Sequence, residues 1–122
     1  MYFRLANYRQ PQLAADVGET DDNAFEAYVK AGCRKCVVTR QLHPSAKIVR
    51  LQSDAFSPEM LDKALKTAAA ETILIVEGIR QKTALWQSLT GNNAVATTYD
   101  MYQCGVAVIG NRQNKQSYKL II

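Results

Sequence analysis

Apolar residues recur at helical spacing in three parts of the chain. The clearest part begins at Ser57-Pro58, where Ser57 can accept a hydrogen bond from a first-turn amide and Pro58 has no amide to leave unpaired. The apolar stripe that follows consists of Leu61, Ala64, Leu65, Ala68 and Thr72. Spacings of three and four predict a helix whose apolar side packs on a sheet.

Two shorter helices are predicted on either side of this one. Asn23 and Glu26 have the spacing of a capping box, which predicts a helix over 24–31. Residues 80–89 place their apolar side chains at helical spacing and are followed by Gly91, a residue that commonly ends a helix. The chain is therefore expected to contain about three helices.

Strands are predicted where apolar and polar residues alternate, or where a short apolar run stands between turn residues. Seven segments fit this description: 2–9, 35–42, 46–52, 72–76, 95–102, 105–109 and 116–122. Pro11 ends the first strand, so residues 11–21 are predicted to form a connecting loop, and a turn is predicted over 110–114. The second and third strands are predicted to form a hairpin, with a parallel arrangement left open. The apolar end, residues 120–122, is expected to pair inside the sheet or across a dimer interface.

The element order β-α-β-β-α-β-α-β-β-β predicts an α/β to α+β fold with a mixed sheet flanked by about three helices. The chain has 122 residues, of which 48% are hydrophobic, and it shows no linker or repeat, so one globular domain over 1–122 is expected. No apolar run approaches the ~18–20 residues that a membrane helix requires. The N-terminus lacks the features of a signal peptide, and three cysteines suit a reducing compartment, so we expect a cytoplasmic protein.

The basic residues are concentrated in one segment. The net charge is +4, yet residues 27–53 contain six lysines or arginines and no acid. If these side chains share a face, they form a cationic surface suited to phosphate backbones. The candidate nucleic-acid contacts are Lys30, Arg34, Lys35, Arg40, Lys47 and Arg50. Six tyrosines could stack on bases, although tyrosine is equally common at protein interfaces.

A C-x-x-C pattern, Cys33-Arg34-Lys35-Cys36, offers either a redox dithiol or two ligands for zinc. A four-ligand zinc site would need both His43 and Cys104 as further ligands, because the chain contains no second C-x-x-C or H-x-x-H pair. His43 precedes a proline in a predicted turn and is expected at the surface. The pattern favours two reduced thiols, and Cys33, Cys36 and His43 remain the metal candidates.

Glu77 stands where the buried strand 72–76 meets the next helix, a position at which the active-site groups of open α/β sheets often lie. The run Ile75-Val76-Glu77-Gly78 resembles the first motif of Toprim domains, in which such a glutamate supports metal-dependent phosphoryl chemistry. The D-x-D pair that those domains add on a later strand is missing here, so nothing more of that family is carried over. A metal-dependent enzyme around Glu77, with Asp100 or the cysteines, is one hypothesis; a glutamate that caps the next helix is the simpler one.

No glycine-rich phosphate loop occurs in the chain, so no cofactor is expected. No set of catalytic side chains can be assembled either. This favours a small non-catalytic binding or regulatory protein that acts through protein–protein contacts or self-association, as a homodimer formed through its C-terminal strands. A nucleic-acid-binding accessory protein that uses residues 30–50 is the alternative, and the enzyme around Glu77 is the third hypothesis.

Overall fold

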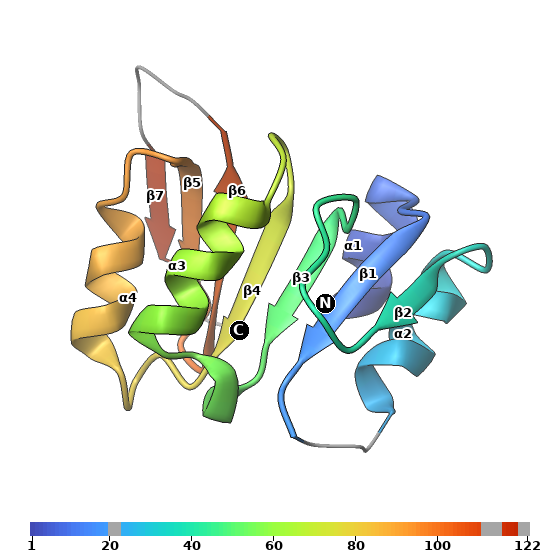
Figure 1. The fold of residues 1–122 in the computed structure, drawn as a ribbon, viewed down its shortest axis with the longest axis horizontal. Coiled ribbons are helices and arrows are strands. Elements are labelled where there is room, and N and C mark those ends of the chain that lie inside the picture. Colours follow the sequence, from blue (N-terminus) through green and yellow to red (C-terminus); the bar gives the residue numbers. More distant parts are fainter. Residues whose placement is uncertain (20–22, 111–115, 120–122) are drawn as a thin grey trace.

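A seven-stranded mixed sheet forms the centre of the computed structural model, which describes residues 1–19, 23–110 and 116–119 (Figure 1). The strands are β1 (Leu13–Val17), β2 (Val37–Thr39), β3 (Ile48–Leu51), β4 (Ile73–Glu77), β5 (Val95–Asp100), β6 (Cys104–Ile109) and β7 (Gln116–Lys119). In the order β2-β1-β3-β4-β6-β5-β7, the first four strands are parallel, and β6 runs antiparallel to both β4 and β5. Strand β7 pairs in parallel with β5. The predicted mixed sheet in a single α/β domain is confirmed.

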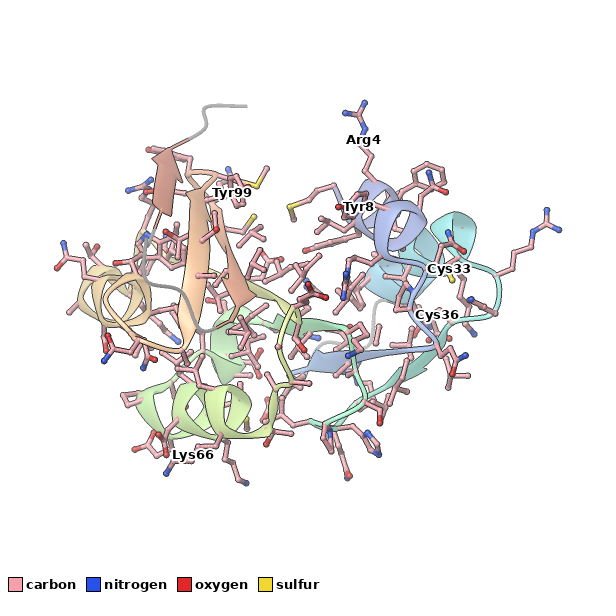
Figure 2. The ribbon with its side chains drawn as sticks, turned by 90° about the horizontal axis from the view of Figure 1, so that it is seen from above. Arg4, Tyr8, Cys33, Cys36, Lys66 and Tyr99 are labelled. Atoms are coloured by element: carbon pink, nitrogen blue, oxygen red, sulfur yellow. The ribbon has the colours of Figure 1, made fainter. Side chains whose placement is uncertain are left out.

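Helices cover both faces of this sheet, as Figures 1 and 2 show. The described α-helices are α1 (Tyr2–Arg9), α2 (Ala24–Gly32), α3 (Pro58–Thr67) and α4 (Thr83–Thr90), and a short 3-10 turn spans Ser53–Ala55. Strand residues alternate between two apolar cores: Ala15 and Val49 point toward α3 and α4, whereas Ala14 and Ile48 point toward α1 and α2. Of the described helices, none combines the length and the apolar character that crossing a membrane requires.

Residues 2–9, predicted as a strand, form the helix α1 instead. The residues that suggested a strand also fit helical spacing, since Tyr2, Leu5 and Ala6 all pack against the core on the α2 side. Gly32, the last residue of α2, allows the two helices to approach closely, because an added Cβ there would lie 2.4 Å from the carbonyl oxygen of Phe3. Packing against α2, which local sequence does not reveal, selects the helix over the strand.

Residues 11–21, predicted as a loop, contain β1 in the parallel half of the sheet. A charged residue, Asp16, interrupts the apolar run of this strand, and the interruption conceals it in the sequence. Strand β1 lies between β2 and β3, and its Ala14 is paired with Val38 on one side and Ile48 on the other. The predicted hairpin of 35–42 with 46–52 is therefore wrong, and both segments run parallel to β1.

Most later elements lie where the pattern places them. The Ser57 hydroxyl accepts a hydrogen bond from the Met60 amide at 3.2 Å, which confirms the predicted start of α3. The helix over 24–31 is confirmed as α2, but the Asn23 side chain makes no capping hydrogen bond, so the capping box is wrong. Residues 111–114 of the predicted turn and the apolar end, residues 120–122, lie outside the described residues.

Candidate functional site

Three parallel strands, β1, β3 and β4, end at the same edge of the sheet, which is the lower edge in Figure 1. After β1 the chain forms β2 on one side of that strand, and it then returns to form β3 on the other side. In open α/β sheets, ligands bind at such a change of direction, in the crevice outside the carboxyl ends of the strands. The carboxyl ends of β1 and β3 therefore form the first candidate site.

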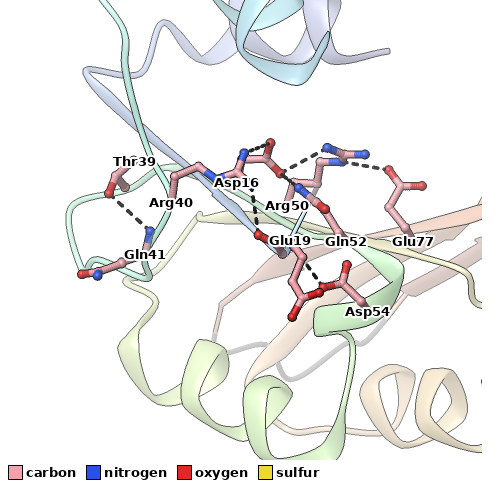
Figure 3. Close-up of polar contacts among 10 residues, drawn as sticks. Asp16, Glu19, Thr39, Arg40, Gln41, Arg50, Gln52, Asp54 and Glu77 are labelled. Atoms are coloured by element: carbon pink, nitrogen blue, oxygen red, sulfur yellow. Dashed lines mark hydrogen bonds and ion pairs between the residues drawn. The ribbon is translucent and has the colours of Figure 1, made fainter. Parts of the chain in front are cut away.

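Asp16 is the charged residue at the centre of this edge. Its side chain is 3% exposed, and its Oδ1 accepts hydrogen bonds from Arg50 Nη1 at 3.1 Å and from Gln52 Nε2 at 3.1 Å (Figure 3). Arg40 Nη1 lies 3.5 Å from the other carboxylate oxygen, and Arg40 Nη2 donates to the Gly18 carbonyl at 3.0 Å. The two arginines neutralise the buried carboxylate, and Arg40 connects the end of β2 to the turn after β1.

Arg50 extends the cluster to β4 and α1. Its Nε donates to Glu77 Oε1 at 3.2 Å, and the Tyr2 hydroxyl donates to the same oxygen. The guanidinium carbon also lies 5.5 Å from the centre of the Tyr2 ring and 5.7 Å from that of Phe25, within the range of cation–π contact. We call Asp16, Arg40, Arg50, Gln52 and Glu77, with Tyr2, the edge cluster.

The side chains around Arg50 and Tyr2 keep both of these groups protonated. Burial alone would lower the pKa of Arg50, but Tyr2, Asp16 and Glu77 outweigh burial and leave that pKa above its ordinary value. Burial, together with the hydrogen bond to Glu77, raises the pKa of the Tyr2 phenol. The guanidinium stays charged and the phenol stays protonated near neutral pH. Arg50 therefore acts as a fixed positive charge and Tyr2 as a fixed hydrogen-bond donor, and neither side chain exchanges its proton near neutral pH.

The turns at this edge press against the residues that follow β3. Gly18 has φ +150°, and an added Cβ there would lie 2.5 Å from the Gln52 side chain. Gly78, after β4, has φ +75°, and its added Cβ would lie 2.5 Å from the Ser53 hydroxyl. Both positions require glycine because of backbone conformation and close approach. The chain's own loops therefore occupy much of the carboxyl edge.

This arrangement limits the chemistry of the edge. The sequence that follows β1 has a single glycine, Gly18, before α2 begins, so it lacks the G-x-G-x-x-G pattern that holds a dinucleotide pyrophosphate. Asp16 and Glu77 each accept a hydrogen bond from Arg50, so the two carboxylates are already bound to the same guanidinium. The edge cluster fits a structural charge arrangement better than an acid–base pair.

The sequence-based metal candidates do not assemble into a ligand set within the described residues, which contain no group of three or more His, Cys, Asp or Glu side chains placed to hold a metal ion. Cys33 and Cys36 are buried, and their thiols lie near backbone carbonyls, of Pro11 at 3.3 Å and of Val37 at 3.6 Å. Burial, followed by the charge of Cys33, raises the pKa of Cys36. His43 is exposed, as expected, and its Nδ1 accepts a hydrogen bond from the Ser45 amide.

Glu77 and Asp100 belong to separate ion pairs. Glu77 pairs with Arg50, whereas Asp100 pairs with Arg80 near the Tyr102 ring. Cys104 lies directly opposite Glu77 in the pairing of β4 with β6. Burial, and then the charge of Glu77, raises the pKa of the Cys104 thiol to about 11, so this cysteine is a poor nucleophile at neutral pH.

Three of the six nucleic-acid candidates are held in ion pairs: Lys30 with Glu26, and both Arg40 and Arg50 with Asp16. The other three, Arg34, Lys35 and Lys47, form no ion pair within the described residues. The nucleic-acid surface remains a prediction, and Arg34, Lys35 and Lys47 are its available contacts.

Sequence reasoning missed Asp16 and Gln52, and it considered Tyr2 only as one of the six tyrosines that could stack on bases. One signal for Asp16 was available, because a carboxylate inside an apolar run must find a partner when the strand is buried. Its partner Arg50 is 34 positions away in the chain, and no local pattern connects the two.

A second feature lies on the face that carries α1 and α2. These helices cover the half of the sheet that contains β1 and β3, while the half with β5 and β6 has no described helix above it (Figure 2). Between α1 and the open half runs a groove of about 510 Å³. It is lined by Met1, Leu5, Tyr8, Arg9, Glu71, Ile73, Tyr99, Met101, Val106 and Val108. We call it the open groove, and Figure 2 labels Tyr8 and Tyr99, which belong to its two sides.

Comparison with known proteins supports the fold. No protein-family model matches the chain, and no curated protein is similar to it in sequence. A solved structure, the crystal structure of cofactor-bound Rv0187 from MTB, is similar with a TM-score of 0.68. The match covers 91% of this chain and 78% of that chain, at 12% sequence identity. An identity this low shows a shared fold and leaves function to be argued from the residues.

Proposed function

We propose that this chain is a small non-catalytic binding or regulatory protein that acts through contact with another protein. The observation that carries the proposal is the open groove, where the sheet face of β5 and β6 presents apolar side chains beside α1. Tyr8 is 81% exposed and Met1 41% exposed at its rim. Exposed apolar surface rimmed by polar groups commonly marks an interaction site, and Tyr and Met are enriched at such interfaces.

The carboxyl edge supports the non-catalytic part of the proposal. Doubly wound folds place their ligand at this edge, but here Arg40 and Arg50 bind the Asp16 carboxylate, and Lys82 donates to the carbonyl groups of Ser53 and Phe56. The polar groups of the edge thus satisfy one another. On this basis the chain has a fold that commonly binds small ligands but uses it as a structural support. Its surface for a protein partner is the open groove, on the sheet face that carries α1 and α2.

The test uses one groove variant and one matched control. Val108→Glu places a charge in the open groove, whereas Gln87→Glu adds the same residue at an exposed position of α4. Each tagged protein is cross-linked in its native extract, and the recovered proteins are quantified. We expect a partner that is recovered with the wild type and with Gln87→Glu and is lost with Val108→Glu. Identical recovery with all three proteins would refute the proposal.

A second candidate function is the binding of a small cofactor at the carboxyl edge, favoured by the fold shared with cofactor-bound Rv0187. Arg40 is the side chain most able to make room, because 39% of it is exposed and it is held through Asp16 and Gly18. Thermal shift and calorimetry with adenine-containing cofactors (ATP, NAD, FAD and S-adenosylmethionine) test this candidate. Saturable binding by the wild type that changes in Arg40→Ala would support it, and no binding by either protein would remove it.

A further inference from the structure

We propose that the open groove seats a second copy of this chain, in a two-fold symmetric dimer in which Arg9 of each protomer pairs with Glu71 of the other. This inference rests on the proposed function and names the protein partner that the groove receives. The dimer contact then lies at α1 and at the sheet face of β5 and β6. The sequence alone suggested a contact through the C-terminal strands.

Arg9 provides the positive group. It is the last residue of α1 and lines the groove. Its Nε is buried and forms no hydrogen bond within the described residues. A buried N–H without an acceptor costs free energy, so the Arg9 guanidinium is not fully satisfied within its own protomer. A carboxylate brought into the groove would give this guanidinium a charge-assisted hydrogen-bond partner.

Glu71 provides the negative group in the same groove. It sits in the turn before β4 with a left-handed backbone, φ 70°, and its amide donates to the Ile109 carbonyl at 2.7 Å. This hydrogen bond fixes the backbone, while the side chain is exposed and its carboxylate has no ion-pair partner within the described residues. Among the described residues that line the groove, Arg9 and Glu71 are thus an arginine and a glutamate without an ion-pair partner.

This pair of charges selects a second copy over an unrelated partner. In a two-fold interface the same surface meets itself, so that residue i contacts residue j and j contacts i. A patch with one positive and one negative group is complementary to its own rotated copy, and both charges are then paired. A strongly acidic or basic partner would leave one of the two unpaired.

The apolar part of the groove provides the rest of the contact. Met101 and Tyr99 line its sheet side and are partly buried, and Met1 and Tyr8 line its helix side. Burying these side chains against their symmetry mates removes apolar surface from water, the main favourable contribution to protein association. Phe3, 45% exposed on α1, adds apolar surface on the same helix.

The experiment measures the dimer dissociation constant by light scattering and sedimentation of the full chain over a range of concentrations. We expect the wild type to be dimeric, and Arg9→Glu and Glu71→Arg each to raise the dissociation constant by about tenfold or more. An equimolar mixture of the two single variants should form a heterodimer, because each of its two contacts then joins a carboxylate to a guanidinium, one in the native order and one with the charges exchanged. The double variant should also dimerise.

Two control variants complete the design. Arg4→Glu changes the charge of α1 away from the groove, as Figure 2 shows, and Glu59→Arg changes an exposed residue of α3; both should dimerise as the wild type does. A monomeric wild type, or a mixture of single variants that fails to associate, overturns the dimer. If the wild type is monomeric and Val108→Glu still loses a different partner, the inference fails while the proposed function stands.

Discussion

Arg50 of β3 lies directly opposite Asp16 of β1 in the parallel register, and the two side chains meet at 3.1 Å under α1 and α2. The side chain of Asp16 is 3% exposed and that of Arg50 15% exposed, so the pair is largely removed from water. A buried ion pair gives little net stability compared with apolar residues, yet the loss of one partner leaves an uncompensated charge. The pair therefore acts mainly to hold β1 and β3 in register.

Asp16→Asn tests this view of the pair. Removal of the carboxylate leaves Arg50 with Glu77 as its remaining anion, and we expect a loss of about 3 kcal/mol in the free energy of unfolding. Urea unfolding followed by circular dichroism provides the measurement. Asp62→Asn is the matched control, because Asp62 and its partner Lys66 are 63% and 76% exposed and such a pair contributes about 0–1 kcal/mol. Equal losses in both variants would contradict the assignment.

Local chemistry predicted some elements well. Ser57-Pro58 predicted the start of α3 because capping depends on residues that are adjacent in the chain. The run before Glu77 predicted β4 because a central strand between parallel and antiparallel neighbours is apolar on both faces. The α3 cap depends on residues adjacent in the chain, and β4 is recognised by its apolar composition alone, so neither requires knowledge of distant residues.

The errors arose where distant residues decide the structure. Pro11, Gly18 and the polar or acidic positions of residues 11–21, Asp16 among them, predict a loop where the structure has β1. Asp16 is accommodated in this buried strand because Arg50 lies opposite, and nothing near Asp16 in the sequence indicates that partner. Arg50 itself was assigned to a nucleic-acid surface, since its position in a basic segment is visible in the sequence and its ion pairs are not. The edge cluster could be found only in three dimensions.

Ser57→Ala tests the N-terminal cap of α3, on which sequence and structure agree. The hydroxyl accepts a hydrogen bond from the Met60 amide at 3.2 Å, and loss of such a cap costs roughly 1 kcal/mol. Ser88→Ala removes a hydroxyl at an exposed position of α4 and should leave stability within about 0.5 kcal/mol of the wild type. Thermal unfolding of both variants by calorimetry gives the comparison. A stable Ser57→Ala protein would show that packing alone starts the helix.

Stability should fall at alkaline pH partly through Cys104. Its thiol has a pKa raised from 9.0 to about 11 in the folded protein, so between these values the folded state holds a proton that the unfolded state releases. By linkage, the free energy of unfolding decreases as pH rises through this window and is not affected by this group below it. Denaturant midpoints under reducing conditions at pH 8 and pH 10.5 should differ less for Cys104→Ala than for the wild type. The same pH dependence in both proteins would contradict the raised pKa.

Gly105→Ala tests the packing of α4 on the sheet. Gly105 belongs to β6, and the other face of this strand lines the open groove. Gly105 lies in β6 beneath Trp86, and an added Cβ would lie 2.3 Å from the indole ring, so the ring or the strand must shift. Overpacking of this kind costs typically about 1–3 kcal/mol. Gly110→Ala, at the end of the same strand, meets the Ala96 side chain at an ordinary 3.5 Å and should be nearly neutral. Tryptophan fluorescence during urea unfolding reports both stability and the surroundings of Trp86. A neutral Gly105→Ala with unchanged fluorescence would show that Trp86 does not rest on this glycine.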